Sequence, residues 1–254
     1  MNKTQEKNFP VTSKVIAVWG SPNAGKTTFA AKLAKSIYDR YSTTVLVLHT
    51  DNVTPDLPVL FPNYKADELY SVGATLAKPD ITQADLLKNI ITLKNKNNLG
   101  FVGYMDGENK FTYPVYDESK AIMLINVMKS IADYVIVDCT STLENVLTSV
   151  ALERADSVIR LCVPSLKNMS FFTSQLALYT DPKYNLDEQI IGINITEKDI
   201  YSAVEETKVH FKEVRFVLPY CREVKQQMSD GKILENVIDK KYNTKLNAIA
   251  DKVV

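Results

Sequence analysis

The chain has 254 residues, of which 45% are hydrophobic and 24% are charged, a composition typical of a globular protein with a sizeable core. Its thirty acidic and thirty basic residues cancel, so the overall charge gives no support to a nucleic-acid binder, although it does not exclude a local basic patch. No apolar run approaches the ~18 residues that span a bilayer, and the polar residues 1–14 lack the apolar core of a signal peptide. We expect a cytoplasmic protein with a flexible segment at 1–13 and a single domain at 14–254.

Cysteine and histidine are rare in this chain. Cys139, Cys162 and Cys221 each lie in or beside an apolar run, and His49 and His210 are the only histidines. There is no C-x-x-C pair, so the sequence offers no familiar spacing of transition-metal ligands. We expect buried free thiols in a reducing compartment and no transition-metal site.

Residues 20–27 read Gly-Ser-Pro-Asn-Ala-Gly-Lys-Thr and match the phosphate-loop pattern G-x-x-x-x-G-K-[ST]. The apolar run at 15–19 predicts a strand before the loop. A helix is predicted after it, because Phe29, Leu33, Ile37 and Tyr41 recur every four residues. The glycines let successive N–H groups turn toward an anion, and the helix adds the positive end of its dipole.

Two side chains of this loop suit a triphosphate with its metal. Lys26 can reach the β- and γ-phosphates, and Thr27 can offer its hydroxyl to Mg²⁺. A chance turn between a strand and a helix is the alternative, but both flanks fit the phosphate loop. We therefore predict binding of a nucleoside triphosphate, by the residues Gly20, Ser21, Pro22, Asn23, Ala24, Gly25, Lys26, Thr27 and Thr28.

The next part of the chain pairs a buried strand with an irregular segment. Residues 43–48 are continuously apolar and predict a strand that is covered on both faces. Three prolines in the loop at 51–62 exclude a regular helix, and this loop is expected at the sheet edge where ligands bind. Thr82 is a candidate cap for the following helix. The side chains expected on one face of that helix are Leu86, Leu87, Ile90 and Ile91.

Apolar runs and amphipathic stretches continue to alternate to the end of the chain. Strands are predicted at 99–105, 134–138, 158–163, 190–194 and 214–218, and helices at 118–132 and from about 234 to the end. This order predicts an α/β fold in one domain, with a doubly wound, mostly parallel sheet flanked by helices.

Two carboxylates follow predicted strands. Asp138 ends an apolar strand, the position from which a Walker-B-type carboxylate reaches Mg²⁺, and its alternative role is a helix cap or turn residue. Asp51 likewise follows a buried strand, so it could orient the attacking water or support the metal, and its alternative role is a surface turn.

Together these stretches resemble the MinD/ParA family of deviant-Walker P-loop ATPases, including the CpaE/TadZ-like proteins of pilus assembly and the ATPase domain of bacterial capsule tyrosine kinases. The likeness runs nearly end to end, through residues 20–28, 45–51, 134–138, 155–158 and 217–224. It implies the P-loop fold, ATP and Mg²⁺ as ligands, and an ATP-dependent homodimer that acts with a protein partner that the sequence does not identify.

The resemblance also implies roles for single residues. Asp51 corresponds to the aspartate that supports hydrolysis, so it and Lys26 become the catalytic candidates. Thr27, Asp51 and Asp138 become the candidate metal-site residues. The remaining cofactor contacts implied are those with adenine and ribose, by Asn194, Pro219 and Tyr220.

Several positions depart from the family pattern. Ser21 stands where the family has its signature lysine, which reaches the phosphates of the dimer partner, and Asn23 replaces a usual glycine. His49 stands where many members have the first aspartate of an Asp-x-Asp pair, and the proline common after Asp138 is missing. Without the signature lysine we expect ATP binding with slow hydrolysis.

We therefore expect a slow Mg-dependent ATPase that acts as a dimerisation or positioning switch for a pilus, secretion or conjugation assembly. The alternatives are a ParA-like DNA-partitioning ATPase and a non-hydrolysing ATP-binding scaffold. Adenine is favoured over guanine, because Glu197-Lys198-Asp199 has the residue types of the guanine motif in the wrong order. The basic residues that could form a DNA patch, although their spacing is more typical of a solvated helix face, are Lys232, Lys240, Lys241, Lys245 and Lys252.

Overall fold

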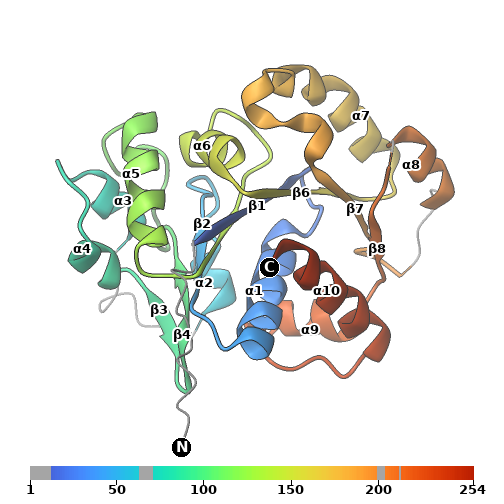
Figure 1. Cartoon of the computed structure of the whole chain (residues 1–254), viewed down its shortest axis with the longest axis horizontal. Coiled ribbons are helices and arrows are strands. Elements are labelled where there is room, and N and C mark those ends of the chain that lie inside the picture. The colour runs from blue at the N-terminus through green and yellow to red at the C-terminus, as the bar shows by residue number, and fades with distance from the viewer. Residues whose placement is uncertain (1–12, 63–70, 199–203, 212) are drawn as a thin grey trace, which may run out of the picture.

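A computed structural model describes residues 13–62, 71–198, 204–211 and 213–254. Within this part of the chain, eight strands form one sheet in the order β3-β4-β2-β5-β1-β6-β7-β8, and every neighbouring pair is parallel except β3 and β4 (Figure 1). The predicted doubly wound, mostly parallel α/β fold is thus confirmed. The strands are β1 (Lys14–Gly20), β2 (Val45–His49), β3 (Ile91–Leu93), β4 (Lys96–Val102), β5 (Tyr134–Asp138), β6 (Ser157–Cys162), β7 (Ile190–Asn194) and β8 (Phe216–Leu218).

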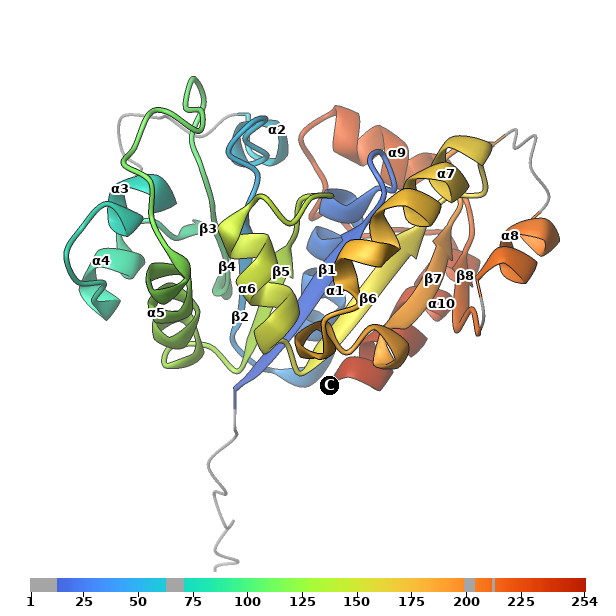
Figure 2. The ribbon, with the colours of Figure 1, turned by 90° about the horizontal axis from the view of Figure 1, so that it is seen from above.

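Helices cover both faces of the sheet (Figures 1 and 2). The helices are α1 (Lys26–Tyr41), α2 (Leu57–Leu60), α3 (Val72–Leu76), α4 (Gln83–Leu87), α5 (Glu118–Lys129), α6 (Val146–Arg154), α7 (Leu166–Gln175), α8 (Val204–His210), α9 (Arg222–Ser229) and α10 (Lys240–Val253). Short 3-10 turns follow α7 at Leu176–Tyr179, Pro182–Tyr184 and Leu186–Glu188.

The central strand shows how the two layers of core arise. Side chains of a strand alternate between its faces, so Ile16 and Val18 pack into the layer that holds α1, α9 and α10. Val15, Ala17 and Trp19 pack into the other layer, with α5, α6 and α7. Both layers are apolar, which is why strands of this kind read as continuous hydrophobic runs rather than alternating ones.

The helix predicted after Thr82 has different bounds in the structure. Thr82 caps α4 through a capping box with Asp85, as expected. The helix nevertheless ends at Leu87, which is 60% exposed, and Ile91 begins strand β3 opposite Phe101 of β4. A short apolar run does not show whether it belongs to a helix or to a strand. The prediction that Leu87 and Ile91 lie on the inner face of one helix was therefore wrong.

The last helix and the proline-rich loop also differ from expectation. The chain turns after residue 234, and α10 begins at Lys240 with Asp239 as its cap. Within 51–62 the structure has one helical turn, α2, whose Pro58 is tolerated because a first-turn N–H would have no partner in the helix.

Some further predictions concern side-chain burial. Cys139, Cys162 and Cys221 are buried free thiols, as expected. Tyr41, expected on the core face of α1, is instead 36% exposed.

None of the helices in the described segments is long and apolar enough to cross a membrane. The predicted flexible segment lies outside the described residues apart from Ser13.

Candidate functional site

The loop between β1 and α1 lies at the carboxyl edge of the sheet. Two of its residues have left-handed backbone, Asn23 with φ 60° and Gly25 with φ 75°. A Cβ atom on Gly20 would lie 2.1 Å from the carbonyl oxygen of Leu161, and one on Gly25 would lie 2.7 Å from Nδ2 of Asn194. Both glycines are therefore required by close approaches of β6 and β7 to the loop.

Asn194 supports the loop from the end of β7. It ends β7, is 9% exposed, and donates from Nδ2 to the carbonyl oxygen of Ala24 at 2.8 Å. The side chain singled out for adenine thus also holds the backbone of the loop in place.

Lys26 projects from the start of α1 across the loop. Its Nζ donates to the carbonyl oxygen of Ser21 at 3.1 Å and to Oγ of Ser141 at 2.8 Å. Burial lowers the pKa of Lys26, and the nearby carboxylates, Asp138 first, partly oppose that shift. Ser141, which the sequence did not single out, lies in the stretch after β5 where the family's common proline is missing.

Ser21 is 1% exposed and points into the protein. Its hydroxyl donates to Oδ1 of Asn168 on α7, and the N–H of Val163 donates to the same oxygen at 3.1 Å. The side chain that the resemblance aligns with the family's signature lysine is therefore hydrogen-bonded within the same chain.

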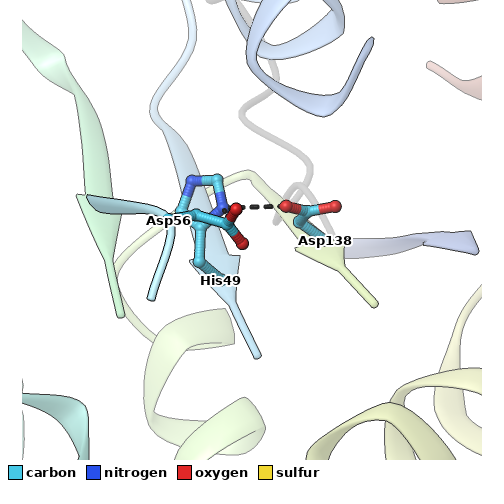
Figure 3. A group of neighbouring side chains, drawn as sticks. All are labelled: His49, Asp56 and Asp138. Carbon is cyan, nitrogen blue, oxygen red and sulfur yellow. Dashed lines mark hydrogen bonds and ion pairs between the residues drawn. The ribbon is translucent and has the colours of Figure 1, made fainter. Parts of the chain in front are cut away.

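Three ionisable side chains meet beside the loop (Figure 3). His49 at the end of β2 donates from Nδ1 to Oδ2 of Asp138 at the end of β5, at 2.9 Å. Asp56 brings its Oδ2 to 4.0 Å from the same nitrogen, and its Oδ1 accepts from Oγ1 of Thr27 at 3.3 Å. Burial, then the charge of Asp138, raises the pKa of Asp56 to about 6, although His49 acts in the opposite direction.

Asp51 lies apart from this group. Its Oδ1 accepts the N–H groups of Val53 at 2.8 Å and of Thr54 at 2.9 Å, so the carboxylate turns the chain as it leaves β2. It still lines the same cavity as Lys26 and Asp138. Asp56 is the carboxylate that sequence reasoning missed, and the only signal for it was its place in the proline-rich loop expected at the ligand edge.

Two cavities adjoin the loop. The first, of about 780 Å³, is lined by Pro22, Asn23, Lys26 and Thr27 together with Asp51, Asp56 and Asp138. The second, of about 370 Å³, is lined by Asn23, Gly25, Thr28, Asn194, Pro219 and Tyr220. Asn23 lines both, so the loop lies between the two cavities, and the larger one holds the charged side chains Lys26, Asp51, Asp56 and Asp138. Of the predicted contacts, Gly20, Ser21 and Ala24 line neither cavity among the described residues.

Solved structures of MinD/ParA family ATPases share the fold of this chain. A ParA family ATPase from Chlorobium tepidum has a TM-score of 0.77 at 16% identity, covering 94% of this chain and 98% of that one. The septum site-determining protein MinD of Pyrococcus horikoshii, complexed with Mg-ADP, has a TM-score of 0.67 at 18% identity, with 95% and 96% covered. The ATP complex of a Cyanothece McdA variant has a TM-score of 0.67 at 16% identity, with 95% and 96% covered.

No protein-family model matches the sequence, and no curated protein matches it. The likeness to the ParA, MinD and McdA structures, at these low identities, establishes the shared fold.

Proposed function

We propose that this protein binds ATP with Mg²⁺, hydrolyses it slowly, and acts as a nucleotide-controlled dimerisation or positioning switch for a larger assembly of the pilus, secretion or conjugation type. The observation that carries the proposal is the position of the glycine-bounded loop between two cavities. One cavity gathers Lys26 and the carboxylates, and the other is suited to a base.

The loop has the features that a triphosphate requires. The left-handed backbone at Asn23 and Gly25 curves the chain ahead of α1, whose N-terminus favours negative charge. Lys26 already lies over the loop, and phosphate oxygens would compete with Ser21 and Ser141 for its ammonium. Asn194, Pro219 and Tyr220 would then face the adenine and ribose on the other side.

The residues present also suit a magnesium ion. Asp138 is 3% exposed, and among the described groups its Oδ1 has no hydrogen-bond partner. A buried carboxylate oxygen without a partner is costly, and a hard cation prefers such oxygen ligands. Thr27 and Asp138 would hold the ion against the phosphates. Asp51, in the loop after β2, would orient the attacking water or support the ion. The ion would offset the phosphate charge.

The related structures support this proposal by analogy. The MinD structure contains Mg-ADP and the McdA structure contains ATP. Slow turnover is proposed because residue 21 is a serine, which has no ammonium group to supply to a second active site and whose hydroxyl bonds to Asn168 of the same chain.

Nucleotide binding is tested by titrating ATP in Mg²⁺ buffer with the wild-type protein and with Lys26→Ala. Loss of a charge-assisted hydrogen bond costs ~1.5–3 kcal/mol, so Lys26→Ala should bind roughly 10–100-fold more weakly. Lys245→Ala is the control, because Lys245 is exposed on α10 away from both cavities. Equal affinity of Lys26→Ala and wild type would overturn the proposal.

The switch is tested by light scattering with ATP and with ADP. We expect the mass to double with ATP and return to that of one chain with ADP, and Asp51→Ala to retain the ATP-bound dimer for longer. An unchanged mass, together with unchanged protease sensitivity of the 51–62 loop, would reject the switch while leaving ATP binding intact.

A further inference from the structure

His49, Asp56 and Asp138 place one nitrogen and two carboxylate oxygens within 4.8 Å of one another (Figure 3). The sheet fixes two of these donors, because His49 and Asp138 are directly paired in the register of β2 and β5. Asp56 comes from the segment after β2, just before α2. The group is thus built by tertiary structure and has no signature in the sequence spacing.

Burial distinguishes this group from a cluster of surface charges. His49 is 1% exposed and Asp138 is 3% exposed. The imidazole Nε2 and the carboxylate Oδ1 of Asp138 have no hydrogen-bond partner among the described groups. Asp138 and Asp56 also line the larger cavity, so an ion can reach them from solvent.

We propose that His49, Asp56 and Asp138 bind a divalent first-row transition-metal ion more tightly than Mg²⁺, and that His49 sets this preference. The inference rests on the proposed function, because it names the metal of the same site. Mg²⁺ prefers oxygen ligands and retains water, whereas imidazole suits ions such as Mn²⁺, Co²⁺, Ni²⁺ and Zn²⁺. An aspartate in place of His49 would supply oxygen ligands alone.

The distances agree with a shared ion. Two ligand atoms at ~2.1 Å from one metal can be at most ~4.2 Å apart. Nδ1 of His49 lies 2.9 Å from Asp138 and 4.0 Å from Asp56, within that limit. The two carboxylates, within 4.8 Å of each other, need at most a small movement of Asp56. A neutral imidazole carries a single proton, so Nδ1 can bind the ion when that proton lies on Nε2, and no net release of a proton is required.

The test is a calorimetric titration of nucleotide-free protein with Co²⁺ and with Mg²⁺. Wild type should bind Co²⁺ at least ~10-fold more tightly than Mg²⁺. His49→Asn should weaken Co²⁺ binding by at least ~10-fold, since even outer-shell changes reach that size. His210→Asn is the matched control, because His210 is exposed on α8.

Equal Co²⁺ affinity in His49→Asn and wild type would overturn the inference, as would equal affinity of wild type for Co²⁺ and Mg²⁺. Circular dichroism checks the folding of His49→Asn. Asp56→Asn is a second variant from the loop outside the sheet, and it should also weaken Co²⁺ binding. ATP binding and its loss in Lys26→Ala are measured separately, so failure of the metal preference and failure of the proposed function are distinguishable.

Discussion

Gly25 is the residue on which the shape of the phosphate loop depends most directly. Its φ of 75° is unfavourable for other residues, and its missing side chain makes room for Asn194. Gly107 has nearly the same φ, 76°, but a Cβ atom there would meet nothing within 4 Å. Alanine substitutions at the two glycines can therefore distinguish the cost of backbone strain from the cost of losing a tertiary contact.

We predict that Gly107→Ala lowers the free energy of unfolding by about 1 kcal/mol through backbone strain alone. Gly25→Ala should cost about 1 kcal/mol more, because its methyl group would displace Asn194 from the carbonyl oxygen of Ala24. Urea unfolding of the two variants measures the difference. Equal costs would mean that the Asn194 contact contributes nothing to stability.

The sequence predicted the phosphate loop but missed Asp56, whose carboxylate accepts a hydrogen bond from Thr27 of that loop. The phosphate loop is local, so its glycines and Lys26 could be recognised from eight consecutive residues. Asp56 could not, because its approach to His49 and Asp138 depends on how the chain turns after β2. The expectation of no transition-metal site rested on local spacing in the same way.

Helix α1 is held against α9 and the segment before α10 by a buried lysine. Lys32 is 1% exposed, and its Nζ donates to Oε1 of Gln227 on α9 and to the carbonyl oxygen of Glu235 at 3.0 Å. Burial, and then the neighbouring charge of Lys35, lowers the pKa of Lys32 to about 8. The contact joins elements nearly 200 residues apart in sequence, and hydrophobic periodicity carries no sign of it.

The lowered pKa predicts a pH dependence of stability. Between the folded pKa of about 8 and the ordinary value of 10.5, the unfolded chain binds more protons at Lys32, so this lysine's contribution to stability rises with pH. Relative to Lys32→Met, the wild type should gain ~1 kcal/mol of unfolding free energy between about pH 7.5 and 9. Urea unfolding at both pH values measures this gain, and parallel pH profiles would contradict it.

The predicted bounds of a strand were correct where its apolar run fits a strand and not a helix. The buried strands Tyr134–Asp138 and Ile190–Asn194 have the predicted bounds, because both faces are covered and every residue is apolar until the polar end. The run at 90–93 failed because pairing with β4, a tertiary contact, decided between helix and strand.

The order of strands brings the site together in the whole molecule. β2 and β1 both neighbour β5, so the carboxyl ends that carry His49, Asp138 and the phosphate loop meet at one edge. Each strand could be predicted from its own residues. Their order in the sheet depends on contacts between segments far apart in the chain, and the sequence analysis did not predict it.

One sheet that runs through the described chain predicts a single cooperative unfolding transition, in line with the proposed single domain. ATP with Mg²⁺ at ~100 times its dissociation constant should then raise the free energy of unfolding by ~2.7 kcal/mol. Lys26→Ala should show little of this gain at the same concentration. Urea unfolding followed by two spectroscopic probes tests both points, and two separate transitions would contradict the single domain.

The larger cavity also has a consequence for how its ligands influence each other. Among the described residues that line it, four are acidic (Asp51, Asp56, Asp138 and Glu144) and two are basic (Lys26 and Lys110). A triphosphate that enters alone is repelled by the excess negative charge of the cavity. A divalent ion that enters first reduces this repulsion. Binding free energies are reciprocal, so the nucleotide must strengthen the hold on the ion by the same factor. The charge of the cavity therefore predicts that each ligand binds more tightly when the other is already in place.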